Sequence, residues 1–309
     1  MQKVYMPIYK NYIHKLLENV DKTHIPNEID LVLDSGAFKG IYMYGALLYV
    51  KELEHKKYTK VHRISGSSVG AMLGCFYILN KMELIERLYT DMRKEFNNTL
   101  HLDSVLNIIE REIHKMDKNT YKTLNNRIFI NYMDISAKKE IIVSTFTSND
   151  DLIDKLRKTT FIPIISNDEL TYDNCTDAMC PHIFTERIIG NKILFINLWN
   201  FGGIQKFLNT FYDTNAVSRT FGGILDIHEF FLRNSPTKMC SYVNDWNVIH
   251  YSIYRLRELV WLITIFIIHT SLIISQYIPE NIKTSIYANT MHSLFLKTFK
   301  DFTYCIMGA

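Results

Sequence analysis

The sequence predicts an α/β protein with mostly parallel strands, followed by a helical C-terminal region. Two stretches carry this prediction, residues 29–54 and residues 60–81. Each begins with a short apolar run of the buried-strand type, breaks at small residues and continues in a helical pattern. A strand, a turn and a helix that recur in this way are typical of parallel strands joined by helical crossovers.

The composition allows one sizeable core and argues against several kinds of site. The chain has 309 residues, and 47% of them are hydrophobic. Its 35 basic and 32 acidic residues leave a net charge of +3 without a dense basic block, so nucleic acid is not an expected partner. The five cysteines form no Cys-x-x-Cys pair, which argues against a zinc site and a disulfide framework and fits a reducing compartment. The N-terminal residues lack the apolar run of a signal peptide.

The pattern along the chain divides it into three regions. Residues 1–27 are mixed and polar, and we expect a helix and a loop there. Residues 28–199 contain the strand–turn–helix units and are expected to form the main domain. Within them, residues 82–126 have apolar positions at helical spacing, which predicts a helical cap on the surface. Residues 200–309 are expected to be mainly helical.

An apolar segment lies in the C-terminal region, at residues 260–278. It contains no Asp, Glu, Lys or Arg, and at about 1.5 Å per residue a helix of this length nearly matches a membrane's hydrocarbon core. Polar residues such as His269 and Ser275 dilute it. A buried core helix and a membrane-spanning or membrane-embedded anchor therefore both remain open. Arg255 and Arg257 precede the segment, which for an anchor would favour the cytoplasmic side at that end.

The second strand–helix turn contains the pattern Gly-x-Ser-x-Gly. Ser68 is its central serine, with Gly66 two residues before it and Gly70 two residues after it. A nucleophilic serine on a sharp strand-to-helix turn needs such small neighbours, and a helix N-terminus favours the negative charge that develops in the reaction. Small residues would equally suit a helix that packs closely on a sheet, as Ala71 and Gly74 also indicate. Both interpretations stay open on the turn alone.

A histidine that could complete an ordinary esterase triad is not evident. The later histidines are His182, His228, His250, His269 and His292. None lies in a clear loop after a predicted strand, where an α/β-hydrolase places its histidine. If Ser68 is a nucleophile, its base is therefore expected to be of another kind.

The first strand–helix turn reads Asp-Ser-Gly-Ala-Phe-Lys-Gly, at residues 34–40. Backbone N–H groups at such a turn can face a cavity and suit an oxyanion, and Lys39 adds a positive charge that a phosphate-bearing substrate would favour. A plain turn with a solvated lysine is the alternative. Both turns follow neighbouring parallel strands, so both lie at the carboxyl ends of the strands, where α/β sheets bind ligands.

These motifs together resemble those of the patatin-like phospholipases. The stretch DSGAFKGIYMYGALLYVKEL precedes RISGSSVGAMLGCFYI in the order and at the spacing of that family, and the similarity extends over roughly residues 28–185. The resemblance implies a three-layer α/β/α fold with a catalytic domain at residues 28–199. It also implies a Ser-Asp dyad without histidine, which would explain why no suitable histidine is evident.

The resemblance implies a role for particular residues of this chain. Ser68 is the expected nucleophile and Asp173 the expected base, because the family's aspartate commonly precedes a proline by eight residues and Pro181 has that spacing. Asp177 is the alternative base. The family has two small residues after its aspartate, whereas residues 174–175 are asparagine and cysteine.

The resemblance also implies an oxyanion hole and a phosphate contact. The backbone amides of Gly36, Ala37 and Val69 are expected to hold the oxyanion, and Lys39 is expected to contact a headgroup phosphate. Ser35 and Ala37 replace glycines of the family's turn. Alanine keeps its N–H, but it costs more than glycine if its φ is positive.

The function implied by the resemblance is hydrolysis of lipid acyl esters through an acyl-enzyme, with phospholipids as the leading substrate. No metal and no organic cofactor is implied. The expected partners are a phospholipid or other lipid ester and the surface of a membrane, which residues 260–278 could contact from the cytoplasmic side. Two alternatives stay open: a weakly active or inactive lipid-binding protein of the same fold, and an α/β-hydrolase that uses a late histidine.

Overall fold

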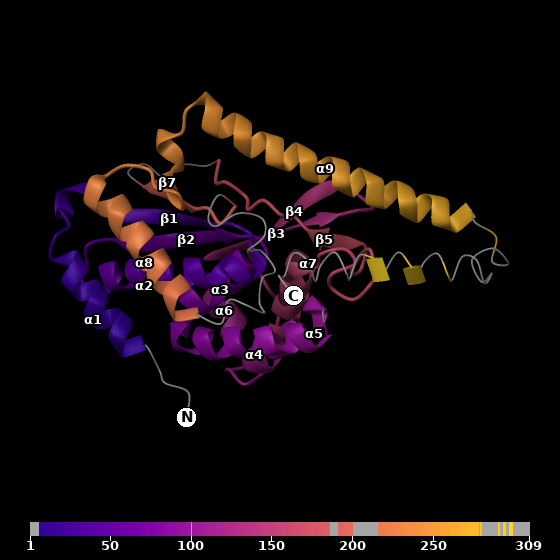
Figure 1. The fold of residues 1–309 in the computed structure, drawn as a ribbon, viewed down its shortest axis with the longest axis horizontal. Helices are drawn as coiled ribbons and strands as arrows, with labels where there is room; N and C mark the ends of the chain where they lie inside the picture. Colours follow the sequence, from indigo (N-terminus) through magenta and orange to yellow (C-terminus); the bar gives the residue numbers. More distant parts are fainter. Residues whose placement is uncertain are drawn as a thin grey trace.

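The protein has a central sheet with helices on both faces (Figure 1). The structure is a computed structural model that describes residues 6–99, 101–185, 191–199 and 216–277, with a few positions between 279 and 298. The strands of the described part are β1 (Glu28–Leu33), β2 (Lys60–Gly66), β3 (Ile128–Asp134), β4 (Lys139–Val143), β5 (Cys175–Asp177), β6 (Lys192–Ile196) and β7 (Cys240–Tyr242).

Strand directions confirm the predicted mostly parallel α/β sheet. The strand order is β4-β3-β2-β1-β6-β7, and β5 pairs with β3 outside this path. The central pairs β3–β2, β2–β1 and β1–β6 are parallel, whereas β4, β5 and β7 each pair antiparallel with a neighbour. Since parallel strands need crossovers that cover the sheet, both faces of this sheet are expected to be buried.

The helices of the described part are α1 (Met6–Leu17), α2 (Gly40–His55), α3 (Val69–Ile78), α4 (Ile85–Thr99), α5 (Leu102–His114), α6 (Thr120–Leu124), α7 (Asn149–Thr160), α8 (Ala216–Arg233) and α9 (Val248–Tyr277). The contacts of alternate residues of β1 show that these helices cover both faces of the sheet. Leu31 and Leu33 belong to the large core formed with α2, α3 and α8, whereas Val32 packs with Tyr254 of α9. The molecule thus has the three layers implied by the sequence.

The regions expected along the chain can be followed in the structure. Helices α4, α5 and α6 lie within residues 82–126, where the sequence predicts a helical cap. Beyond residue 199, β7 pairs with β6 in the sheet and α8 packs against α2. The boundary between residues 199 and 200 stays a prediction, and residues 200–215 lie outside the described part of the chain.

Residues 260–277 of the apolar segment form the C-terminal part of α9, and Ile278 lies outside the described residues. No helix in the described ranges is long and apolar enough to cross a membrane, so a membrane-spanning segment is not supported. One face of α9 is buried, with Tyr254 and Ile265 each 4% exposed, whereas Phe266 on the other face is 64% exposed. In Figure 1, α9 runs along the top of the molecule and extends beyond the sheet.

Helices α2 and α8 approach each other at two glycines. A Cβ atom on Gly223 would lie 1.8 Å from the carbonyl oxygen of Tyr42, and one on Gly45 would lie 2.0 Å from that of Thr220. Neither backbone can retreat without separating the helices, so hydrogen is the only side chain that fits at either position. This contact fixes α2, whose N-terminus follows the turn at residues 34–40.

We predict that Gly223→Ala lowers the free energy of unfolding by about 1–3 kcal/mol, because the added methyl group forces α2 and α8 apart. Gly222→Ala is the matched control, since its Cβ would meet only the ring of Tyr42, at 3.2 Å. Urea denaturation of both variants measures the difference. Equal losses at the two positions would contradict the proposed close approach.

Candidate active site

Ser68 lies in the tight connection between β2 and α3. Its backbone has φ of 54° and ψ of −125°, a conformation that residues with a side chain rarely adopt. A Cβ on Gly66 would lie 2.6 Å from the backbone nitrogen of Ala71, and one on Gly70 would lie 2.4 Å from the carbonyl oxygen of Leu33. Backbone crowding therefore requires both glycines of the Gly-x-Ser-x-Gly pattern, and the turn has the strain of a nucleophile elbow.

Strand pairing brings Asp177 to the end of β2. Strand β2 pairs with β3 as far as Gly66, opposite Ile130. Strand β4 occupies one edge of β3 along residues 130–134, so β5 must continue on the edge that β2 uses. Asp177 lies opposite Tyr132, only two residues further along β3 than Ile130. Strand β5 therefore ends with the carboxylate of Asp177 close to the elbow at the end of β2.

The carboxyl group of Asp177 is fully buried and faces the elbow. Its Oδ1 accepts hydrogen bonds from the Ser67 hydroxyl, at 2.9 Å, and from the Met179 backbone N–H, at 2.8 Å. Its Oδ2 has no partner at full hydrogen-bonding distance among the described residues. The Ser68 side chain is nonetheless close enough to lower the pKa of this carboxyl. Oδ1 is thus held by two donors, whereas Oδ2 accepts no hydrogen bond from the described residues.

Burial raises the pKa of Asp177 to about 7. Hydrogen bonds from Met179 and Ser67 and the nearby Ser68 side chain oppose this rise, and the negative charge of Asp34 adds to it. A carboxylate in water is a weak base because its pKa is near 4. With a pKa near neutrality, Asp177 is a much better proton acceptor and is still largely ionised above pH 7.

The structure does not bring Asp173, the base expected from the proline spacing, to Ser68. Asp173 and Asn174 are the two central residues of a tight turn between Tyr172 and Cys175, and both have positive φ, as a type I′ turn requires. The Asp173 side chain is 69% exposed and pairs with Lys158 at 2.7 Å. This lysine lowers the pKa of Asp173, so the carboxylate is an exposed ion-pair partner at a hairpin tip.

Thr159, near the end of α7, is hydrogen-bonded to the backbone of the elbow. Its side-chain oxygen accepts a hydrogen bond from the Ser68 backbone N–H, at 3.0 Å, and donates one to the carbonyl of Asn131, at 2.7 Å. Thr159 is completely buried. The sequence assigns it no role, because no motif marks it.

The three expected oxyanion amides remain available in the structure. The N–H groups of Gly36, Ala37 and Val69 donate to no acceptor among the described residues. Ala37 has φ of 43°, so alanine adopts the left-handed conformation that glycine would adopt at lower cost. Ala37, Val69 and Ser68 all line one pocket, which places the elbow and the turn at a shared cavity.

Lys39, which is expected to contact a headgroup phosphate, is buried in the structure. Only 2% of the residue is exposed, and its ammonium group donates to the carbonyl oxygen of Leu198 at 3.3 Å. A Cβ on neighbouring Gly36 would lie 2.7 Å from the side chain of Leu198, which packs directly on the turn. Lys39 thus contacts the chain just after β6, and its contact with a headgroup phosphate stays a prediction.

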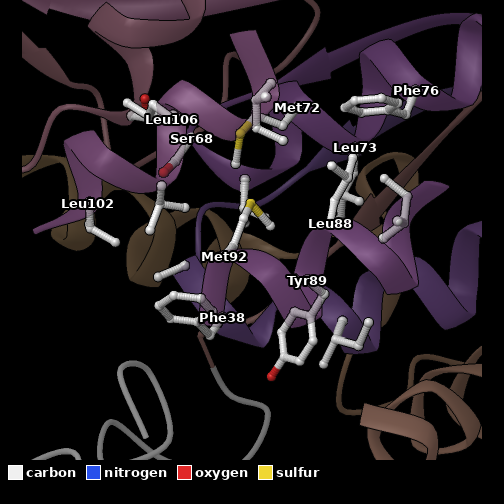
Figure 2. A pocket seen from close by; sticks show the side chains of 18 of the residues that line it. Phe38, Ser68, Met72, Leu73, Phe76, Leu88, Tyr89, Met92, Leu102 and Leu106 are labelled. Atoms are coloured by element: carbon white, nitrogen blue, oxygen red, sulfur yellow. The ribbon is translucent and has the colours of Figure 1, made fainter. Parts of the chain in front are cut away.

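The pocket beside Ser68 is almost entirely apolar. It encloses about 750 Å³ of space between atoms, part of it open to solvent, which is within the usual range of ligand pockets. Figure 2 shows Ser68 at one side, with side chains of α3, α4 and α5 around the space. Residues labelled there include Phe38, Met72, Leu88, Met92, Leu102 and Leu106. Such a lining suits a hydrocarbon chain.

None of the described histidines hydrogen-bonds to Ser68 or Asp177. His182 packs edge-on against Phe184, and burial lowers its pKa. His228 lies 3.1 Å from the hydroxyl of Tyr49. His292 lies outside the described residues. A triad with a late histidine therefore receives no support from this part of the chain.

Comparison with known proteins agrees with the geometry. The chain is 22% identical to human omega-hydroxyceramide transacylase over 135 residues, which are 41% of this chain and 25% of that protein. It thus spans only about a quarter of this relative's length. Residues 31–246, more than half of the chain, match the patatin-like phospholipase family. The chain belongs to the patatin-like phospholipase family.

Proposed function

We propose that this protein is a serine acyl hydrolase that cleaves the acyl esters of phospholipids, with Ser68 as nucleophile and Asp177 as base. The observation that carries the proposal is the pairing of a strained elbow serine with a buried carboxyl whose pKa is near 7. Membership of a family of lipid acyl hydrolases supports it. Asp177 takes the place expected for Asp173 because it alone of the two lies at the elbow.

In the first half of the proposed reaction, the Ser68 hydroxyl attacks the carbonyl carbon of the ester. Its proton passes to Oδ2 of Asp177, and the carbonyl oxygen becomes an oxyanion. The N–H groups of Gly36, Ala37 and Val69 are the donors that would stabilise this charge. Collapse of the intermediate breaks the ester bond, and Asp177 returns the proton to the departing alcohol, leaving an acyl group on Ser68.

In the second half, water attacks the acyl-enzyme, and Asp177 accepts its proton and passes it to Ser68. The product is a free fatty acid. Another alcohol in place of water would yield a new ester, which is the kind of reaction named for the human relative. The acyl acceptor is therefore a point on which members with this dyad can differ, and product analysis distinguishes the two outcomes.

The apolar pocket supports a long acyl chain as the group that is transferred. Its lining offers almost no polar atoms apart from Ser68 and Thr160 near the elbow. Burial of each methylene group contributes about 0.8 kcal/mol, so a long chain would bind much more strongly than a short one. The headgroup would remain outside this pocket.

The outer face of α9 supports contact with a membrane surface, which a phospholipase must reach. Large apolar side chains on this face are between about half and four fifths exposed. They include Ile249, Leu256, Leu259, Ile263, Phe266 and Ile267. A helix with one face docked and one apolar face exposed suits a position in the plane of the interface, without spanning.

A lipid-binding protein without turnover is the second candidate. Ala37 and Met179 have φ of 43° and 58°, in the conformation that favours glycine, and they flank the expected oxyanion and the base. This strain could displace the groups around the ester. The pocket and α9 would serve binding equally well, so only measurement of turnover separates the two candidates.

We predict that a fluorophosphonate labels Ser68, and that Ser68→Ala abolishes the label. Asp177→Asn should slow labelling by about 10²–10⁴-fold, because a general base is lost. Asp173→Asn is the matched control and should label like wild type. Mass spectrometry of the labelled peptide gives the result. Loss of labelling in the Asp173 variant alone would contradict the assignment of Asp177, and absence of label on folded wild type would favour the lipid-binding candidate.

We predict that kcat/KM for a neutral short-chain ester rises with pH and levels off above an apparent pKa of about 7. Burial raises the pKa of Asp177, and only the deprotonated carboxylate can accept the Ser68 proton, so activity is lost as pH falls through this value. A base whose pKa is lowered below the usual value for aspartate, such as Asp173, would keep activity over the whole range from pH 5 to pH 8. A flat profile between pH 5 and 8 would therefore exclude Asp177.

We predict that Phe266→Glu weakens binding to phosphatidylcholine vesicles by about tenfold or more, because burial of one such side chain contributes about 1.5–3 kcal/mol. Ile8→Glu on α1, where the side chain is 53% exposed, is the control for an added charge on an exposed apolar residue. Vesicle sedimentation measures both. Equal binding by the two variants would show that α9 does not contact the membrane.

A further inference from the structure

Helix α9 makes polar contacts with the site from three positions on one face. Tyr254, Arg257 and Trp261 are spaced by three and four residues, so they lie along the same side of the helix. The Tyr254 hydroxyl donates to the carbonyl of Pro181. The Trp261 indole N–H donates to the carbonyl of Asp177 at 2.8 Å, which fixes the backbone of the proposed base itself.

Arg257 forms a two-pronged ion pair with Asp34, the first residue of the turn that carries the oxyanion amides. Its two terminal nitrogens lie 2.8 Å from Oδ1 and 3.2 Å from Oδ2. Asp34 is completely buried and also accepts from the backbone N–H groups of Ser35, at 3.0 Å, and Leu198, at 3.1 Å. The carboxylate of Asp34 thus sets the path of the turn, and Arg257 holds that carboxylate.

The same guanidinium group reaches the loop that follows the base. It donates to the carbonyl oxygen of Met179 at 3.2 Å, and the Ser35 hydroxyl donates to the same oxygen at 2.6 Å. The N–H of Met179 in turn holds Oδ1 of Asp177. Arg257 therefore joins the oxyanion turn and the base loop, which come from opposite ends of the domain.

We propose that Arg257 is a positioning residue for the reaction, which sets the distance between the oxyanion amides and the Asp177 carboxyl. This inference rests on the proposed function, because it needs the dyad of Ser68 and Asp177. Arg257 touches neither the pocket nor the reacting atoms; it acts through Asp34 and Met179. Loss of the tie leaves the nucleophile in place and misplaces the groups around it.

The charges around Asp177 predict that loss of Arg257 also shifts the pH profile of the reaction. The charged group that acts on Asp177 across the site is Asp34, whose negative charge raises the pKa of the base. The elbow contributes the uncharged Ser67 and Ser68 to its surroundings, and α9 contributes the guanidinium of Arg257. Removal of Arg257 leaves the charge of Asp34 uncompensated, so the pKa of the base should rise further.

The test compares full-length Arg257→Gln with Arg255→Gln, using a soluble short-chain ester so that membrane contact plays no part. Arg255 lies two residues away on the same helix, is 69% exposed and pairs with Glu258 at 2.5 Å, so its replacement should change nothing. For Arg257→Gln we expect kcat and the rate of fluorophosphonate labelling to fall by about 10²-fold, because small misplacements cost that much. KM should change little, and the acid limb should move to higher pH. Arg257→Lys should recover part of the rate.

The double variant Asp34→Asn with Arg257→Gln guards against a folding defect, because it leaves no buried charge without a partner. It should fold, and it should remain slow because the tie to Met179 is gone. A folded single or double variant with wild-type kcat and pH profile would overturn the inference while Ser68 still labels in the wild type. Absence of label in the wild type would instead overturn the proposed function and the inference with it.

Discussion

The edge of β3 that β2 and β5 share is the constraint on which the site depends. Strand β2 leaves this edge at Gly66, and β5 takes it up two residues later, so the end of one strand must face the end of the other. Ser68 and Asp177 are 109 positions apart in sequence numbering, yet their meeting needs no long or flexible connection. Hydrogen bonds between the strands set the positions of Ser68 and Asp177 along the sheet, and the core on both faces keeps the strands in register.

That rigid frame carries backbone strain where the chemistry is proposed. Ser68, Ala37 and Met179 all have positive φ without being glycine, and such residues cost about 1–3 kcal/mol each. They persist because contacts around them leave no other path: Thr159 holds the elbow, and the carboxylate of Asp34 holds the turn. The packing of the rest of the domain therefore offsets the cost of this backbone strain and of the burial that raises the pKa of Asp177.

The fold and the candidate nucleophile could be recognised in the sequence because their signals are local. Two strand–turn–helix units and one Gly-x-Ser-x-Gly pattern lie within residues 29–81, and the glycine spacing identifies Ser68 directly. The base could not be chosen in this way. The spacing to Pro181 favoured Asp173, whereas the register of β5 on β3, which no local pattern encodes, brings Asp177 to the elbow. The proposal of Asp177 in place of Asp173 therefore rests on the structure, although the alanine after Asp177 is a small residue like those after the family's aspartate.

Arg257 illustrates the kind of residue that sequence reasoning cannot find. It attracted notice only as a charge before an apolar segment, and its partner Asp34 is 223 positions away. Helix α9 begins at Val248, after the last residue of the family match at 246. The family match therefore ends before a helix that packs on the sheet and binds Asp34. A fragment cut at the end of the match would bury the carboxylate of Asp34 without its counter-ion, so any fragment designed from this chain needs α9 together with the sheet.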